Sequence, residues 1–278
     1  MGDKADGIGF RISSKRLPTL WTQRANRLLD KLFGFETFNA AFRAAPECPD
    51  SELAQAILDA LGVRLELSGA SKDVIPRDGA LVVVCNHPFG IIDGLAIDAV
   101  LQSMRSDVSV IAAHWLAQVP RLRNSILIVV GAQGAEKRRR QSVAGWLTAL
   151  QRLKRGGAVI VFPAGQAARF RWRRLSVADL PWSPHVASVI RKTSAGVVPV
   201  FFEGRNSRAF YVLTAIFPGL ANFLLARECL KKSNASVRAV IGQPIASGEL
   251  SKFRTDEEAV QFLRRTVEAL ARQGAALA

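Results

Sequence analysis

Two side chains of this sequence, His87 and Asp93, have the types and spacing of an acid–base pair. A histidine titrates near neutral pH, and a carboxylate beside its ring can fix the tautomer and stabilise the charged imidazolium. Five residues, including Gly90, separate the two, so both belong to one short loop. The loop could equally be a polar turn in which Asp93 caps the next helix, and the rest of the chain must distinguish these two interpretations.

The loop that contains His87 follows one of three apolar segments that each end in polar, glycine-containing sequence. These segments are 80–85, 157–162 and 197–202, and their loops are 86–94, 163–169 and 203–208. Continuous apolar runs are typical of strands buried on both faces, and ligands bind at the carboxyl ends of parallel strands. If the three strands are parallel, their loops meet around one crevice, which favours catalysis over a simple polar turn.

The rest of the chain alternates between short apolar runs and helical patterns. This alternation predicts an α/β fold with a mostly parallel central sheet and helices on both faces. Strands are expected at 63–67, 80–85, 107–112, 126–130, 157–162, 197–202 and 236–241. Helices are expected at 17–35, 50–62, 94–105, 136–155, 184–193, 209–226 and 256–273.

We divide the chain into an N-terminal helical segment, 1–62, and a larger domain, 63–278. The helix expected at 17–35 has apolar residues on one face and basic residues elsewhere, so it could lie on a membrane surface or pack on its own domain. No apolar run reaches the length of a membrane span. The nearest, 209–226, has no charged residue but contains Pro218, and we expect a buried or interfacial helix that breaks there.

The composition points to a polyanionic partner. Lys and Arg number 38 against 23 Asp and Glu, a net charge of +15. Such an excess favours nucleic acid or an anionic membrane surface. Three scattered cysteines without paired spacing predict neither disulfides nor a zinc site, and we expect no bound metal.

Three motifs occur in an order that resembles the glycerolipid acyltransferase superfamily, which includes the bacterial lysophosphatidate acyltransferases. They are Asn86-His87 with Asp93, then Phe162-Pro163-Ala164-Gly165, then Val198-Pro199-Val200. The sequence around His87 and the segment Phe202–Ser207 are closer to a bacterial subgroup described as hemolysin-like, which is linked to ornithine and glycine lipids. The resemblance covers about residues 80 to 245.

The resemblance implies a glycerolipid acyltransferase-like domain at 63–278 that moves a fatty acyl chain from a thioester to the hydroxyl of a lyso-lipid. His87 would deprotonate that hydroxyl, Asp93 would orient the imidazole, and no acyl-enzyme would form. The donor would be acyl carrier protein or coenzyme A as a co-substrate, and no cofactor is expected. The enzyme would be peripheral on anionic lipid at the cytoplasmic face of the bacterial inner membrane, in membrane lipid synthesis.

The candidate substrate-binding residues come from the three loops: Asn86, Gly90, Phe162, Pro163, Gly165, Gln166, Arg169, Gly204, Arg205 and Asn206. Arg169 could bind a phosphate or carboxylate, or belong to a solvated basic run at 169–174. Arg205 is the better ligand candidate, because its loop would aim it at the crevice. Trp115, Trp146, Trp172 and Trp182 could line an acyl groove, although core packing is the commoner role. His114 and His185 are expected to be ordinary packed or surface histidines.

Two positions depart from the family pattern and bear on the acceptor. Ala164 stands where the family has glutamate, and Gln166 stands where the subgroup tends to have one. A neutral amide accepts a hydrogen bond but cannot pair with an ammonium group. The alternatives that remain are an inactive, lipid-binding homologue and a basic nucleic-acid-binding protein; because no nucleic-acid module is recognisable, we expect no specific nucleic acid partner.

Overall fold

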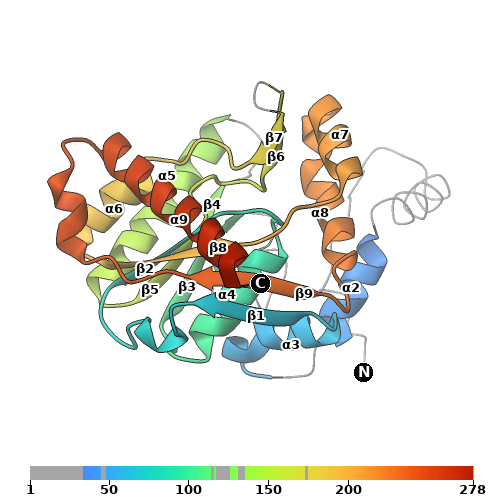
Figure 1. Cartoon of the computed structure of the whole chain (residues 1–278), viewed down its shortest axis with the longest axis horizontal. Coiled ribbons are helices and arrows are strands. Elements are labelled where there is room, and N and C mark those ends of the chain that lie inside the picture. The colour runs from blue at the N-terminus through green and yellow to red at the C-terminus, as the bar shows by residue number, and fades with distance from the viewer. Residues whose placement is uncertain are drawn as a thin grey trace.

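A seven-stranded sheet lies at the centre of the protein, which we describe from a computed structural model (Figure 1). The structure describes residues 34–44, 48–113, 116, 126–130, 135–172 and 175–277. The strands are β1 (Arg64–Gly69), β2 (Leu81–Cys85), β3 (Val108–Ala113), β4 (Ile126–Val130), β5 (Ala158–Val161), β8 (Gly196–Phe202) and β9 (Ser236–Ile241). Their order is β1-β9-β8-β2-β5-β3-β4, and every neighbouring pair is parallel except β8 with β9. The predicted strands and the mostly parallel α/β sheet are confirmed.

Helices cover both faces of this sheet. They are α2 (Phe35–Ala44), α3 (Leu53–Ala60), α4 (Ile92–Gln102), α5 (Ala135–Lys154), α6 (His185–Thr193), α7 (Arg208–Ile216), α8 (Ala221–Leu230) and α9 (Asp256–Leu277). Short 3₁₀ turns lie at η1 (Asp50–Glu52), η2 (Lys72–Val74), η6 (Pro218–Leu220) and η7 (Ser247–Lys252). The helix expected at 209–226 is broken at Pro218, as anticipated. The helix expected at 17–35 lies almost entirely outside the described residues.

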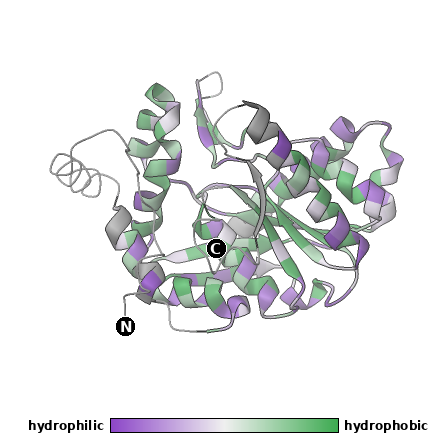
Figure 2. Ribbon diagram, turned by 180° about the vertical axis from the view of Figure 1, so that it is seen from behind, coloured by the Kyte–Doolittle hydropathy of each residue, from purple (hydrophilic) through white to green (hydrophobic). Residues whose placement is uncertain are grey.

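Alternate residues of the central strands supply two hydrophobic layers. In β2, Leu81, Val83 and Cys85 join one core with α3, α4 and α8. Val82 and Val84 point to the opposite face and join the other core, with α5, α6 and α9. This is the period of two expected of a strand, and Figure 2 shows hydrophobic residues following the strands through the interior.

The central position of β2 fixes where the loops meet. β2 pairs in parallel with β5 on one side and with β8 on the other. Their carboxyl ends therefore lie at the same edge of the sheet, and the three loops singled out in the sequence are neighbours.

A short antiparallel hairpin, β6 (Arg169–Arg171) with β7 (Ser176–Ala178), was not expected from the sequence. Its alternating basic and aromatic residues are also typical of a solvated charge run, and three-residue strands give too short a pattern to recognise. Within the described part of the chain, no helix combines the length and hydropathy needed to cross a membrane.

Candidate active site

His87 and Asp93 form a hydrogen-bonded pair at the carboxyl end of β2. His87 Nδ1 lies 3.1 Å from Asp93 Oδ2, and the two side chains are 13% and 0% exposed. Asp93 belongs to the first turn of α4, so the helix that follows the loop brings its carboxylate back under the imidazole. The His87 ring also packs on Phe162 at the end of β5, with 4.2 Å between ring centroids. Since Nδ1 is engaged by the carboxylate, Nε2 is the nitrogen left to exchange a proton with a substrate.

Asp93 is held by backbone amides as well as by the histidine. Its Oδ2 accepts hydrogen bonds from the N–H groups of Phe89 (3.0 Å) and Gly90 (3.2 Å), and its Oδ1 accepts one from Gly94 (3.0 Å). Burial raises the pKa of Asp93, but His87 and the amides of Phe89 and Gly90 more than offset it, so the pKa lies below its ordinary 3.8. The carboxylate therefore stays charged beside the base.

The same pair sets the protonation of His87. Burial lowers the pKa of the imidazole, but the Asp93 charge, the Asp93 hydrogen bond and the charge of Asp179 together raise it above its ordinary 6.5. A raised pKa makes the imidazole a stronger proton acceptor, which suits a general base.

Asp179 is a residue of this site that the sequence did not reveal. Its Oδ1 accepts a hydrogen bond from the backbone N–H of His87 at 3.1 Å, and its Oδ2 accepts one from Trp182 Nε1 at 3.0 Å. The carbonyl of His87 in turn accepts a hydrogen bond from the N–H of Ala168 at 2.7 Å. Both backbone groups of His87 are thus fixed by segments about 80 or more residues away. No recognisable motif surrounds Asp179, because only the hairpin β6–β7 carries it to His87.

The loop 203–207 supports the His87 loop through Phe89. Asn206 is buried and donates from Nδ2 to the Phe89 carbonyl at 3.2 Å. Lys232 Nζ lies 4.6 Å above the centre of the Phe89 ring and donates to Asn206 Oδ1 at 2.8 Å. Gly204 has φ +110°, and a Cβ there would lie 2.8 Å from the same ring. Asn206 and Gly204 therefore brace the loop that contains Asp93.

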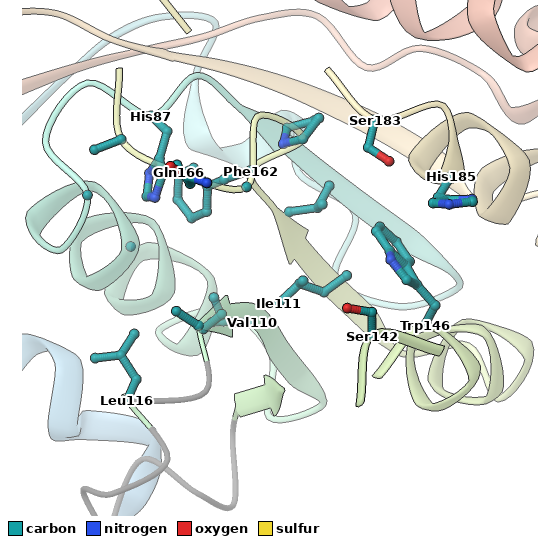
Figure 3. A pocket seen from close by; sticks show the side chains of 18 of the residues that line it. His87, Val110, Ile111, Leu116, Ser142, Trp146, Phe162, Gln166, Ser183 and His185 are labelled. Carbon is teal, nitrogen blue, oxygen red and sulfur yellow. The ribbon is translucent and has the colours of Figure 1, made fainter. Parts of the chain in front are cut away.

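A largely apolar cavity of about 780 Å³ opens from His87 (Figure 3). It has the size and lining of a site for a lipid chain. From His87 it passes α4 and β3 and continues to the space between α5 and α6, where Trp146 and His185 face each other. The lining includes Leu95, Val110, Ile111, Ala112, Leu116, Val143, Trp146, Leu147, Leu150, Val161, Phe162, Val189 and Leu225.

Half of the candidate substrate-binding residues line this cavity: Gly90, Phe162, Pro163, Gly165 and Gln166. Gly90 has φ +95°, and a Cβ would meet Leu225 at 2.8 Å, so only glycine fits. Asn86 instead exchanges two hydrogen bonds with the backbone of Phe202, at 2.6 and 2.9 Å, and ties the end of β2 to the end of β8.

The two candidate arginines lie outside the cavity wall. Arg169 donates to Gln166 Oε1 at 2.6 Å, so the departure from the family pattern is paired with a guanidinium group. Arg205 is exposed and does not line the cavity. Gly204 and Asn206 belong to that brace.

Three further residues line the cavity that the sequence pattern did not mark as parts of the site. Trp146 and His185 line the far end. Asp98, one turn beyond Gly94 on α4, is a buried carboxylate that accepts a hydrogen bond from Gln102 at 3.4 Å, and burial raises its pKa to about 6. Trp182 is buried beside Asp179, Trp172 is exposed, and Trp115 and His114 lie outside the described residues.

Comparison with known proteins bears on this site. A protein-family model described as "Acyltransferase" matches residues 13–274. A lyso-glycine lipid O-acyltransferase from Phocaeicola vulgatus is 28% identical over 231 residues, 77% of this chain and 75% of that protein. One from Bacteroides thetaiotaomicron is 24% identical over 257 residues, 86% of this chain and 87% of that protein. The crystal structure of the 1-acyl-sn-glycerophosphate acyltransferase PlsC from Thermotoga maritima aligns with a TM-score of 0.47 and 18% identity, covering 91% of this chain and 98% of that one.

The family match is wider than the motifs alone suggested. It begins far before residue 80 and ends beyond residue 245, and it contains the His87 loop and the two loops beside it. On that match the chain belongs to the acyltransferase family, and the protein is an acyltransferase.

Proposed function

We propose that the protein is an O-acyltransferase that esterifies the hydroxyl of a lyso-lipid, with His87 as the general base. The observation that carries the proposal is the His87–Asp93 pair at the end of an apolar cavity of about 780 Å³. A cavity of this kind can hold an acyl chain. His87, at one end of the cavity, would then lie beside the thioester group at the end of that chain. The named relatives, both lyso-glycine lipid O-acyltransferases, support a lyso-lipid as the acceptor.

The geometry supports a direct transfer. The acceptor hydroxyl gives its proton to His87 Nε2 while its oxygen attacks the thioester carbonyl carbon. Asp93, ionised and fixed by three amides, stabilises the imidazolium that forms. The carbon–sulfur bond then breaks, and the leaving thiolate takes the proton back from His87. A positioned base of this kind contributes about 10²–10⁴ in rate, and holding both substrates adjacent contributes more.

The donor we propose is the thioester of acyl carrier protein or coenzyme A, acting as a co-substrate. Both carriers are anionic, and the net charge of +15 would favour their approach. The same charge supports a peripheral location on anionic lipid, at the cytoplasmic face of the inner membrane, where such donors are available.

The acceptor we propose is a lyso-aminolipid such as lyso-glycine lipid, with a lysophospholipid as the second choice. Gln166 and Arg169, joined at 2.6 Å, lie beside the cavity and offer a neutral amide and a guanidinium group. That pair suits a carboxylate or phosphate and offers no charge for an ammonium group.

The test is acyl transfer by the purified protein with acyl-coenzyme A or acyl carrier protein thioester. Lyso-glycine lipid and lysophosphatidate are compared as acceptors, and His87→Ala is compared with His185→Ala, a second cavity histidine. We expect ester formation that falls by at least about 100-fold in His87→Ala and by only a few-fold in His185→Ala. Absence of transfer with either donor, or full activity in His87→Ala, would contradict the proposal.

A further inference from the structure

Helix α7 exposes apolar residues where a surface helix normally carries polar ones. Val212, Leu213 and Ile216 lie on one face, and their exposed fractions are 57%, 38% and 61%. The opposite face, with Phe210 and Tyr211, is buried. The solvent side of α7 is therefore an apolar stripe without a partner among the described residues.

The stripe continues around the break at Pro218. Phe217, which lies directly before the 3₁₀ turn, is 57% exposed. No charged residue occurs between Ala209 and Ala226. We call Val212, Leu213, Ile216 and Phe217 the apolar corner. Exposed clusters of this kind mark contact sites for proteins or membranes.

A second apolar tip lies beside the corner. The hairpin β6–β7 carries Trp172 and Leu175, which are 70% and 78% exposed. β6 packs against α7, and Figure 1 shows the hairpin and the α7–α8 pair rising side by side from the same edge of the molecule. Two elements remote in sequence thus present large apolar side chains together.

The charge around the corner is positive. Arg205, Arg208 and Lys231 flank it in the sequence, and we call these three residues the basic collar. Glu228 is the one acidic residue between 204 and 248, and it is buried with hydrogen bonds from Ser207 and Lys231. An apolar tip above a basic collar suits an anionic lipid leaflet, in which side chains enter the acyl region and cations meet the head groups.

The corner also adjoins the active site. Asn222 and Leu225 of α8 line the cavity, as does Gln166, the residue that Arg169 of β6 contacts. A bilayer in contact with the corner would therefore place lipids next to the cavity that contains His87.

We propose that the apolar corner and the β6–β7 tip insert into an anionic lipid leaflet and hold the cavity against it. The inference rests on the proposed function, which already includes a membrane-lipid acceptor and a location on anionic lipid, and it adds the surface that makes the contact. A second copy of the chain is a poorer occupant, because the basic collars of two copies would face each other.

Vesicle co-sedimentation tests the surface without relying on catalysis. The full chain is mixed with phosphatidylcholine vesicles that contain about 30% phosphatidylglycerol, and with pure phosphatidylcholine vesicles. Ile216→Ser/Phe217→Ser removes two of the most exposed side chains of the corner, and we expect binding to the anionic vesicles to weaken by about 10- to 100-fold. Leu213 of the corner is 38% exposed, and Leu67 on β1 is 39% exposed, so Leu67→Ser is the matched control for Leu213→Ser. Only Leu213→Ser should weaken vesicle binding.

Three results would overturn the proposal: unchanged vesicle binding in the double variant, an equal loss in Leu67→Ser, or a dimer that the double variant converts to monomer. If the double variant does not fold, the comparison of Leu213→Ser with Leu67→Ser still tests whether the corner binds the vesicles. Turnover of a short-chain, water-soluble acceptor separates the two hypotheses. Corner variants should keep that turnover and lose activity only on vesicle-borne acceptor. If neither the native protein nor any variant turns over an acceptor, the proposed function is refuted. The vesicle-binding data would still show whether the corner contacts the membrane.

Discussion

Replacing Asp93 by Asn is the sharpest test of the catalytic pair, because it changes charge and hydrogen bonding with almost no change in volume. The carboxylate accepts from His87, Phe89 and Gly90 through Oδ2 and from Gly94 through Oδ1, and it is fully buried. An amide has one acceptor oxygen. Whichever way it turns, its NH₂ group faces at least one backbone N–H about 3 Å away, and a buried donor loses its partner.

The magnitude follows from this arrangement. One unpaired buried donor costs about 1–3 kcal/mol of stability, which leaves a folded protein to assay. If the amide oxygen faces His87, the tautomer survives but the imidazolium loses its counter-charge. If the NH₂ group faces His87, the proton moves to Nε2 and the base is blocked. We expect kcat to fall by about 10²–10⁴ with KM changed only a few-fold.

The pH profile adds a second readout. Neutral His87 is the active form, so kcat/KM is lost as the pH falls through its pKa, which lies above 6.5 in the native protein. Since Asp93 raises that pKa, the acid limb of Asp93→Asn should move to lower pH. Release of thiol from the acyl donor gives both parameters. The matched control is Asp98→Asn, a second buried carboxylate on the same helix that does not contact His87. Activity of Asp93→Asn within about twofold of native, an unmoved acid limb, or an equal loss in Asp98→Asn would refute the reasoning.

Three further predictions concern other parts of the site. Burial raises the pKa of Asp98 from 3.8 to about 6, so above pH 6 the folded protein holds a buried charge that costs stability. Each pKa unit corresponds to about 1.4 kcal/mol, so Asp98→Asn should raise the free energy of unfolding by up to about 3 kcal/mol at pH 7–8. The gain should shrink toward zero as the pH falls to about 4, and urea unfolding that shows no such pH dependence would contradict it. Gly90→Ala, at φ +95° and against Leu225, should lose about 2–3 kcal/mol and most of the activity, and a stable, active variant would show that the loop tolerates a side chain. Trp146→Ala lengthens the far end of the cavity, so products analysed by mass spectrometry should shift to longer acyl chains, whereas an unchanged distribution would place the chain elsewhere.

The sheet could be predicted because each central strand can be recognised from its own residues, without knowledge of distant contacts. Runs such as Val82-Val83-Val84 are buried on both faces, and this leaves a continuous apolar signal. The break at Pro218 followed from the chemistry of proline. The hairpin β6–β7 escaped because three residues cannot establish a period, and its Arg-Phe-Arg sequence is equally typical of solvent-exposed chain.

The site was predictable only in its local part. His87 and Asp93 are close in sequence, so their spacing already indicates a pair. Arg205 was expected to point into the crevice because its loop follows a central strand. The residue after it, Asn206, is drawn inward instead by Phe89 and Lys232, and this leaves Arg205 on the outer surface. Competition between adjacent polar side chains for one buried position is decided by packing, which a single sequence does not contain.

The same distinction explains why the base is held by residues that carry no motif. A loop that ends a strand would be free to move, yet catalysis needs His87 fixed to within about half an ångström. Asp179 and Ala168 fix its backbone from the segment after β5, and Asn206 fixes Phe89 from the loop after β8. The three parallel strands thus do more than gather reactive side chains at one edge, since the two outer loops supply the hydrogen bonds that keep the middle loop in place. Substitutions at Asp179 or Asn206 should therefore lower kcat through the position of His87, and loss of the Asp179 carboxylate should also lower the pKa of the imidazole.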